Sequence, residues 1–359
     1  LDYKCNFACD HCSVGSSPDT EFEMPEETLD QFFDEIEDVP SLQQLVFTGG
    51  EVTLHKDRLL EALRRADDEG YLTRIVTNAW WAHDLESARE TVDELVAAGL
   101  DEINTSYDDF HTEYMDVDPI ANLTQAAIES DLKQVAIACI VGDEDPDWDA
   151  DRLRAEIDER IDADLEATDN VTIIQDSAAP LGSGAQLDIS NLQAMNRLDV
   201  GCPDVVNKVS FHPDGSLKAC CGHAQFYQPD LTLGNIEEEP LVDILSRSGQ
   251  NMVYWLIHEV GPKRLIDKIG VEDDQHYTSI CHACNELLGT HREAFLEYID
   301  ENETDLLLND IILSDRLDKQ VDILTDNRDE LISQIEALHD KDIERGDLDR
   351  IVKTIEIEG

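Results

Sequence analysis

The stretch Leu45-Val46-Phe47-Thr48-Gly49-Gly50-Glu51 decides the expected fold. Its first three residues form a short apolar run, which predicts a buried β-strand. Two glycines follow directly, and paired glycines mark a turn. Beyond this turn, residues 59–66 carry Leu and Ala at the spacing of an amphipathic helix. The stretch therefore predicts a strand, a turn at its end, and a helix.

The same strand-and-helix unit recurs between residues 25 and 175. Short β-rich runs alternate with acidic amphipathic helices, and repeats of this length imply an α/β fold with a parallel sheet and right-handed crossovers. Five strands are predicted, and a sixth would lie before Cys5. The expected strands are residues 45–47, 74–77, 102–106, 135–141 and 171–174, and the expected helices begin at residue 25 and cover 59–66, 84–98, 119–130 and 148–162.

A different pattern follows this region. Two β-rich runs around residues 209–211 and 217–219 flank Pro213-Asp214-Gly215, which predicts a β-hairpin. Residues 240–300 look mostly helical, and the charged tail beyond them carries Leu, Val and Ile at helical spacing. We therefore expect three parts, at residues 1–190, 195–300 and 301–359.

The charge of the chain is extreme, with 82 acidic against 26 basic residues and a formal net charge of −56. The acids are spread over nearly every predicted helix. Their mutual repulsion would destabilise a compact state at ordinary ionic strength, whereas in molar salt the Debye length falls to about 3 Å. We interpret the charge as the adaptation of a halophile to a salt-rich cytoplasm; the alternative is a docking surface for a basic partner. Neither interpretation suits nucleic acid binding, which needs Lys and Arg.

The sequence contains no run of 18 apolar residues and no visible signal peptide, so we expect a cytoplasmic protein without a membrane span. Nine cysteines in such a protein favour metal binding over disulfides. Cys139 stands alone in an apolar run and is predicted to be a buried core thiol. The others form two groups: Cys5, Cys9 and Cys12, and then Cys202, Cys220, Cys221, Cys281 and Cys284.

The first group, Cys5-Asn-Phe-Ala-Cys9-Asp-His-Cys12, supplies three thiolates from one loop. Three thiolates leave one iron of a 4Fe-4S cluster without a protein ligand, so a substrate or cofactor can bind that iron. The alternative is zinc, with His11 as the fourth ligand. In the stretch after the first predicted strand, two glycines let the backbone approach a ligand closely, and Glu51 can accept hydrogen bonds from an ammonium group.

These two motifs and their spacing resemble the radical S-adenosylmethionine (SAM) superfamily. The resemblance implies a partial (β/α)6 barrel and a 4Fe-4S cluster whose open iron is chelated by SAM. Electron transfer from the cluster then cleaves SAM to a 5′-deoxyadenosyl radical, which abstracts a substrate hydrogen. By resemblance the cluster ligands are Cys5, Cys9 and Cys12, and the SAM contacts are His11 beside the adenine, Gly49, Gly50 and Glu51 at the amino group, and Ser106 at the carboxylate or ribose.

Two further polar residues follow the strand that ends at Ser106. Asp108 and His111 belong to the run Ser-Tyr-Asp-Asp-Phe-His, and ligands of parallel α/β sheets bind at the carboxyl ends of the strands. Asp108 and His111 are therefore candidates to face the substrate. The alternative is that they only cap the next helix.

The second group offers four thiolates, two around the predicted hairpin and two in Cys281-His-Ala-Cys284. On the residues alone, tetrahedral zinc and a fully ligated iron–sulfur cluster both remain open. Beside the first motif, the pattern resembles the SPASM extension and more closely its shortened relative, the twitch domain. That resemblance implies a second, auxiliary 4Fe-4S cluster; Cys221 is spare and is expected either to replace Cys220 or to pack. The implied ligands are Cys202, Cys220, Cys281 and Cys284.

Members of this family with such extensions modify peptides or oxidise small molecules. We predict hydrogen abstraction from a peptide or protein side chain. The alternatives are oxidation or decarboxylation of a small metabolite or tetrapyrrole precursor, and a non-enzymatic iron–sulfur or zinc scaffold. The expected partners are a peptide or small-molecule substrate and a low-potential electron donor such as ferredoxin or flavodoxin.

Overall fold

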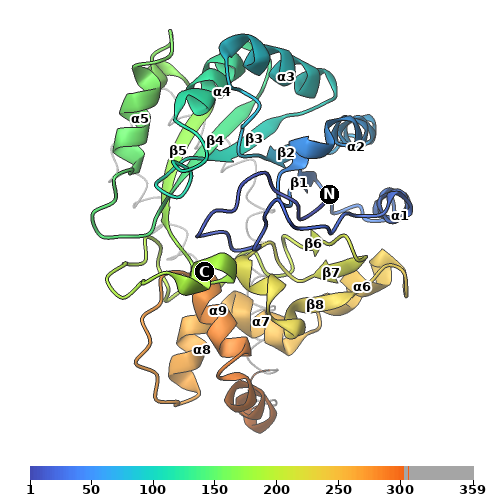
Figure 1. Ribbon diagram of the computed structural model, residues 1–359. Coiled ribbons are helices and arrows are strands. Elements are labelled where there is room, and N and C mark those ends of the chain that lie inside the picture. Colours follow the sequence, from blue (N-terminus) through green and yellow to red (C-terminus); the bar gives the residue numbers. More distant parts are fainter. Residues whose placement is uncertain (303–305, 307–359) are drawn as a thin grey trace, which may run out of the picture. The chain divides into compact units, whose positions relative to one another are not determined.

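The computed structural model describes residues 1–302 and 306. The chain divides into two compact units, Leu1–Leu296 and Glu297–Gly359. Nearly all of the tail predicted at residues 301–359 lies outside the described residues. Every labelled helix and strand in Figure 1 belongs to Leu1–Leu296.

Five parallel strands form the main sheet in the order β1-β2-β3-β4-β5 (Figure 1). Helices alternate with these strands along the chain, so the predicted α/β fold with its parallel sheet is confirmed. The strands are β1 (Gln44–Phe47), β2 (Leu72–Val76), β3 (Glu102–Ser106), β4 (Gln134–Val141) and β5 (Val171–Ser177), and the helices are α1 (Glu26–Ile36), α2 (Lys56–Asp68), α3 (Leu85–Ala97), α4 (Asp118–Glu129) and α5 (Ala150–Asp158).

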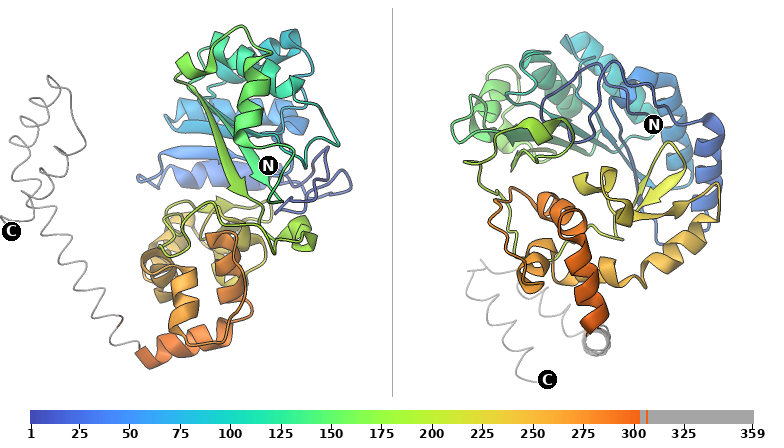
Figure 2. Two further views of the ribbon diagram at one scale, coloured as in Figure 1. Left: turned by 90° about the vertical axis from the view of Figure 1, so that its left-hand side faces the viewer. Right: turned by 60° about the horizontal axis from the view of Figure 1, so that its bottom comes forward.

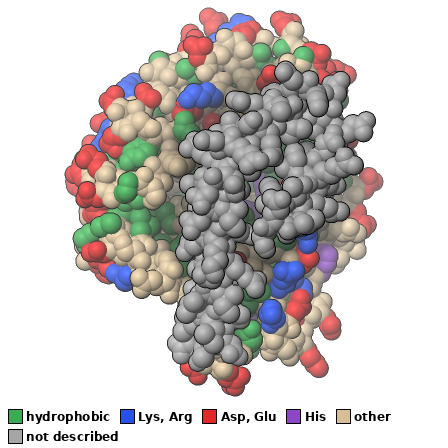
Figure 3. All heavy atoms as spheres, turned by 180° about the vertical axis from the view of Figure 1, so that it is seen from behind, with side chains coloured by type: hydrophobic (Ala, Val, Ile, Leu, Met, Phe, Trp, Pro, Cys, Tyr) green, Lys and Arg blue, Asp and Glu red, His purple; other side chains and the backbone are tan. Residues whose placement is uncertain are grey.

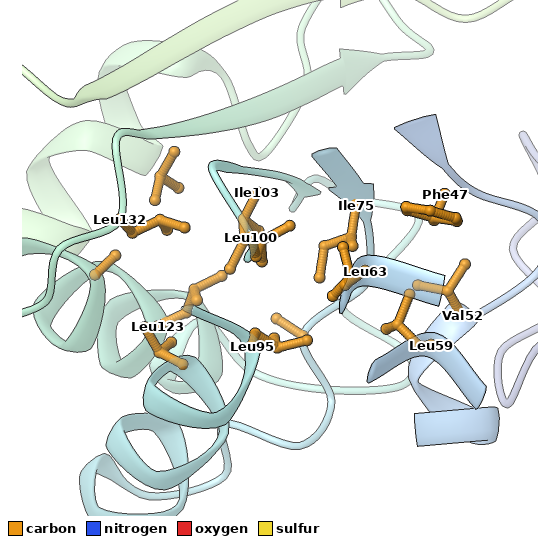
Figure 4. Packing of buried hydrophobic residues seen from close by; sticks show 14 of the residues in the cluster. Phe47, Val52, Leu59, Leu63, Ile75, Leu95, Leu100, Ile103, Leu123 and Leu132 are labelled. Carbon is orange, nitrogen blue, oxygen red and sulfur yellow. The ribbon is translucent and has the colours of Figure 1, made fainter. Parts of the chain in front are cut away.

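The two faces of this sheet differ, because alternate side chains of a strand point to opposite sides. On one face, Phe47 and Ile75 pack with Leu63 of α2 in the main core, together with residues of α3 and α4 (Figure 4). On the other face, Val46 and Ile174 are 44% and 50% exposed. Cys139 is fully buried, as predicted.

Residues 1–4 run alongside the turn that follows β1. The amino group of Leu1 donates to the Thr48 carbonyl at 2.8 Å, and the Gly50 N–H donates to the Asp2 carbonyl at 3.0 Å. The Glu51 N–H then donates to the Lys4 carbonyl at 2.8 Å. This short segment extends the hydrogen bonding beyond β1, at the place expected for the sixth strand, and brings Cys5 to the carboxyl edge of the sheet.

The remainder of this unit contains a small antiparallel sheet and the four labelled helices α6 to α9. The predicted hairpin is present as β6 and β7, and β8 pairs with β7. The N-terminal segment, dark blue in Figure 2, contacts this region, since the Tyr3 hydroxyl lies 2.6 Å from Nδ1 of His212. The elements are β6 (Ser210–Phe211), β7 (Ser216–Lys218), β8 (Thr232–Asn235), α6 (Leu241–Ser248), α7 (Met252–Glu259), α8 (Pro262–Lys268) and α9 (Ile280–Leu288).

On the face of the molecule that Figure 3 shows, acidic side chains are scattered among the described residues, with fewer Lys and Arg between them. Among the described residues, no helix is long and apolar enough to cross a membrane. A surface of this kind repels itself unless counterions screen it.

We expect the free energy of unfolding to rise as KCl is raised from about 0.1 M to about 1 M, because the Debye length falls from about 10 Å to about 3 Å over this range. Urea unfolding followed by circular dichroism measures the change. A stability that stays constant or falls over the same range would contradict the halophilic interpretation of the net charge.

Candidate active site and auxiliary thiol site

The loop that carries Cys5, Cys9 and Cys12 is fastened by segments far apart in the sequence. Its backbone carbonyls accept hydrogen bonds from the region after β3, from the segment after β5 and from the region after β7. Such contacts hold the loop at the carboxyl edge of the sheet, where parallel α/β folds bind ligands. The three bonds are Tyr114 Oη to Ala8 O at 2.8 Å, Ser183 N to Cys12 O at 2.9 Å and Tyr227 Oη to Ser13 O at 2.5 Å.

The three thiols of this loop lie close enough to influence one another. Burial raises the pKa of Cys9 to about 12, and the neighbouring thiols of Cys5 and Cys12 add to the rise. Burial likewise raises the pKa of Cys5 to about 11. Thiols in such surroundings ionise only when a cation compensates their charge, as a metal centre does. The donor set therefore fits a cluster held by three cysteines.

Gly49 and Gly50 have a structural role that the sequence did not reveal. A β-carbon on Gly49 would lie 1.9 Å from the Asp2 carbonyl oxygen, and one on Gly50 would lie 2.0 Å from that of Lys4. The two glycines thus make room for the segment that leads into Cys5. The predicted contact of these glycines with SAM remains a prediction.

Glu51 is completely buried, and its carboxylate joins the ends of two strands. Oε1 accepts hydrogen bonds from Thr53 N at 3.0 Å, from Thr53 Oγ1 at 2.6 Å and from Thr77 Oγ1 at 2.8 Å. Oε2 accepts one from Asn78 N at 2.7 Å. The sequence suggested this carboxylate for the amino group of SAM, but four protein donors already surround it. Glu51 therefore also holds together the residues that follow β1 and β2.

His11 and His111 meet beside the cysteine loop. The His11 ring stacks on Phe110 at 4.4 Å, and its centroid lies 5.3 Å from that of His111. Burial lowers the pKa of His11 to about 4, which keeps the ring neutral and suits stacking against an aromatic base. Ser106 Oγ lies 3.3 Å from Nε2 of His111, so these two candidates share one corner of the site.

Asp108 supports this corner and is fully buried. It lies 2.8 Å from Nδ1 of His111 and accepts backbone N–H groups of Phe110 and Ile140 at 3.0 and 3.1 Å. Burial alone would raise the pKa of Asp108, but the hydrogen bond from His111 and the nearby charges lower it. The oxygens of Asp108 are therefore occupied by the protein, and Asp108 holds the ring of His111 beside Ser106.

The downstream cysteines gather where β7 ends and α9 begins. Burial raises the pKa of Cys220 to about 12 and that of Cys281 to about 11, and the neighbouring thiols add to the rise at each. Cys284 is buried beside Cys281 and Cys220, which raise its pKa further. Cys202 lies near the same thiols, and Cys221 also lies near Cys220 and Cys281 but is exposed. The burial pattern favours Cys220 over Cys221 as a ligand.

Gly222 packs directly against these thiols. A β-carbon there would lie 2.7 Å from Cys281 Sγ and 3.9 Å from Cys220 Sγ. A free thiol can rotate away from an added methyl group, but a thiolate fixed to a metal cannot.

We therefore expect Gly222→Ala to lose the iron of the auxiliary site and to leave the first cluster in place. Iron and sulfide analysis of anaerobically reconstituted protein tests this. Gly249→Ala is the matched control, since a β-carbon at Gly249 meets no atom within 4 Å. Iron content equal to that of Gly249→Ala would contradict this expectation, because it would show that an added methyl group at Gly222 does not displace iron from these thiols.

Some residues of this site carried no clear signal in the sequence. Ser183, between two glycines after β5, and Tyr227 bind the cysteine loop from the other side. The position of Ser183 just beyond a strand end could have suggested it. Nothing comparable marks Tyr227, which lies 214 residues from its partner.

Comparison with known families decides the assignment. The profile of the radical SAM superfamily matches residues 3–157, and that of SPASM, an iron–sulfur cluster-binding domain, matches residues 202–285. The chain belongs to the radical SAM superfamily. This radical SAM enzyme therefore takes SAM and a 4Fe-4S cluster as cofactors, and its SPASM region implies a further iron–sulfur cluster.

The chain is also similar to individual known proteins. The putative peptide biosynthesis protein YydG of Bacillus subtilis (strain 168) is 23% identical over 309 residues, which cover 81% of this radical SAM enzyme and 91% of YydG. The crystal structure of BtrN in complex with AdoMet and 2-DOIA shares 14% identity, with a TM-score of 0.43, over 73% of this chain and 86% of BtrN. An open conformation of BtrN gives 12% identity and a TM-score of 0.38 over 72% and 83% of the two chains.

Proposed function

We propose that this enzyme modifies a peptide by abstracting a hydrogen atom from one of its side chains. The observation that carries the proposal is the similarity to YydG, which extends over 91% of a protein described as a putative peptide biosynthesis protein. The same similarity covers 81% of this chain, in which a radical SAM region is followed by a SPASM region.

The face of the main sheet that carries Val46 and Ile174 supports a peptide substrate. It presents these exposed apolar side chains at both ends, Val46 on β1 and Ile174 on β5. Four strand spacings, about 19 Å, separate β1 from β5, and Ile174 lies four positions, about 13 Å, further along the strands than Val46. An extended peptide of about seven residues at about 3.3 Å each spans the resulting diagonal of about 23 Å, and apolar side chains of the peptide would contact Val46 and Ile174.

In this proposal, Cys5, Cys9 and Cys12 hold the catalytic cluster beside His11 and Ser106. When bound, the cluster and SAM supply the radical that abstracts hydrogen. His111, held by Asp108, lies at the edge of the same site and orients the substrate. Gly49 and Gly50 place Cys5, and Glu51 fixes the neighbouring strand ends.

The auxiliary site completes the proposal. Cys202, Cys220, Cys281 and Cys284 would ligate a 4Fe-4S cluster fully, so this cluster would have no open iron and would carry electrons. A low-potential donor such as ferredoxin or flavodoxin would supply the electron for SAM cleavage. Cysteines that bind a metal and form no disulfide suit the reducing cytoplasm.

The test is to incubate the reconstituted enzyme with SAM, a reductant and synthetic short peptides chosen from reading frames next to its gene, in deuterated water. Deuterated water reveals both a net oxidation and a hydrogen that is removed and then replaced from an exchangeable group. We expect a shifted peptide mass together with 5′-deoxyadenosine. An unchanged peptide mass while SAM is being cleaved would contradict the proposal and favour a small-molecule substrate.

A further inference from the structure

We propose that Asn78 raises the reduction potential of the catalytic cluster, because its side-chain amide donates a hydrogen bond to the thiolate of Cys5. The inference rests on Cys5 being a cluster ligand, as the proposed function does. It needs no substrate, and it therefore stands apart from the identity of the peptide.

The side-chain amide of Asn78 uses all of its hydrogen-bonding groups. Nδ2 lies 2.8 Å from Oδ1 of Asn6 and 3.7 Å from Sγ of Cys5. Oδ1 accepts the backbone N–H of Trp80 at 3.1 Å. An amide has two N–H donors, and they match these two acceptors. The bond from Trp80 fixes the orientation, so that the nitrogen and not the oxygen faces Cys5.

The backbone of Asn78 is anchored as firmly as its side chain. Its N–H donates to Oε2 of the buried Glu51 at 2.7 Å, and Glu51 also accepts from the preceding Thr77. Asn78 itself is only 9% exposed. A hydrogen bond held in such surroundings is stronger than one in water. A line of contacts therefore runs from Glu51 through Asn78 to the first cluster ligand.

Binding of a metal changes the bonds that Cys5 can make. A free thiol can donate to Oδ1 of Asn6, which lies 3.8 Å from Sγ. A metal-bound thiolate has no proton and can only accept. Its described donors are then the Asn78 amide and the backbone N–H of Phe7 at 3.4 Å.

Hydrogen bonds to the sulfurs help to set the potential of an iron–sulfur cluster. Reduction adds negative charge, and an N–H aimed at the thiolate stabilises that charge. The Asn78 amide therefore raises the potential and makes the cluster easier to reduce. Removing the amide is expected to lower the potential.

The test compares two variants with a control. Asn78→Leu removes both donors at similar volume, and Asn78→Asp keeps the shape but replaces the donors with carboxylate oxygens. Asn170→Leu is the control: the amide of Asn170 binds the Leu132 carbonyl at 3.2 Å, and Asn170 precedes β5 at the opposite edge of the sheet. Redox titration followed by electron paramagnetic resonance gives the midpoint potential, and the signal that changes on addition of SAM identifies the catalytic cluster.

We expect a more negative midpoint in Asn78→Leu, a further decrease in Asn78→Asp and the parent value in Asn170→Leu. SAM cleavage without substrate, driven by a fixed amount of reductant, should fall in the same order. A parent-like midpoint in either Asn78 variant would overturn the proposal. Failure of both variants to load iron, with circular dichroism equal to that of the control, would also overturn it, because it would show that Asn78 retains the cluster and does not tune it. A peptide that stays unmodified on incubation with the enzyme would leave these results unaffected.

Discussion

Gly50→Ala is expected to reduce SAM cleavage by at least about 100-fold, since misplacing a reacting group by about 1 Å has an effect of this size. The new β-carbon would lie 2.0 Å from the carbonyl oxygen of Lys4, a distance that real β-carbons do not reach. Lys4 is a backbone neighbour of Cys5, so the first cluster ligand has to move with it. The N-terminal segment would also lose its hydrogen bond from the Glu51 N–H.

The measurement is the amount of 5′-deoxyadenosine that reconstituted protein forms from SAM under reducing, anaerobic conditions, normalised to its iron content. Gly249→Ala again serves as the control, since an added methyl group meets only open space there. Parent-like cleavage by Gly50→Ala would mean that the segment before Cys5 does not need to lie against Gly50.

Glu51→Gln is expected to lower the free energy of unfolding by about 1–3 kcal/mol for each buried donor that it leaves without an acceptor. The carboxylate of Glu51 offers only acceptors, and four donors use it. Glutamine has the same shape, but its NH2 group must face either the Thr53 and Thr77 side or the Asn78 N–H. At least one donor therefore loses its partner.

Urea unfolding at a fixed KCl concentration measures this loss. Glu90→Gln makes the same chemical change at an exposed position of α3, where water solvates both the carboxylate and the amide that replaces it. We expect it to change stability by less than about 0.5 kcal/mol. If Glu51→Gln were as stable as Glu90→Gln, the buried carboxylate would not be what joins β1 to β2.

The main sheet could be predicted from local sequence because its strands are short apolar runs separated by helices of regular period. The run Leu45–Phe47 lies within β1, and the predicted strand at 102–106 coincides with β3. That the thiols of Cys5, Cys9 and Cys12 lie near one another could also be predicted, since all three belong to one short loop.

The remaining features depend on contacts between distant residues. Asn78 meets Cys5 across 73 positions, and neither residue's neighbours in sequence hint at the other. The sequence marks the glycines at 49 and 50 as a place where a ligand approaches the backbone, but the carbonyls that lie against them belong to Asp2 and Lys4. Asp108 follows a strand end, where a substrate contact could be expected from the sequence. The structure shows that one of its oxygens instead accepts the N–H of Ile140 on β4. Sequence spacing predicts which residues carry the chemistry, whereas the partners of those residues emerge only from the packing.

The most direct test of the cysteine assignment is electron nuclear double resonance on the reduced, reconstituted enzyme with SAM labelled at its amino nitrogen. If Cys5, Cys9 and Cys12 hold a cluster with an open iron, the labelled nitrogen will couple to the cluster spin, and Cys9→Ala will abolish the coupling. A reduced cluster that shows no coupling to the label, or coupling that persists in Cys9→Ala, would contradict this assignment.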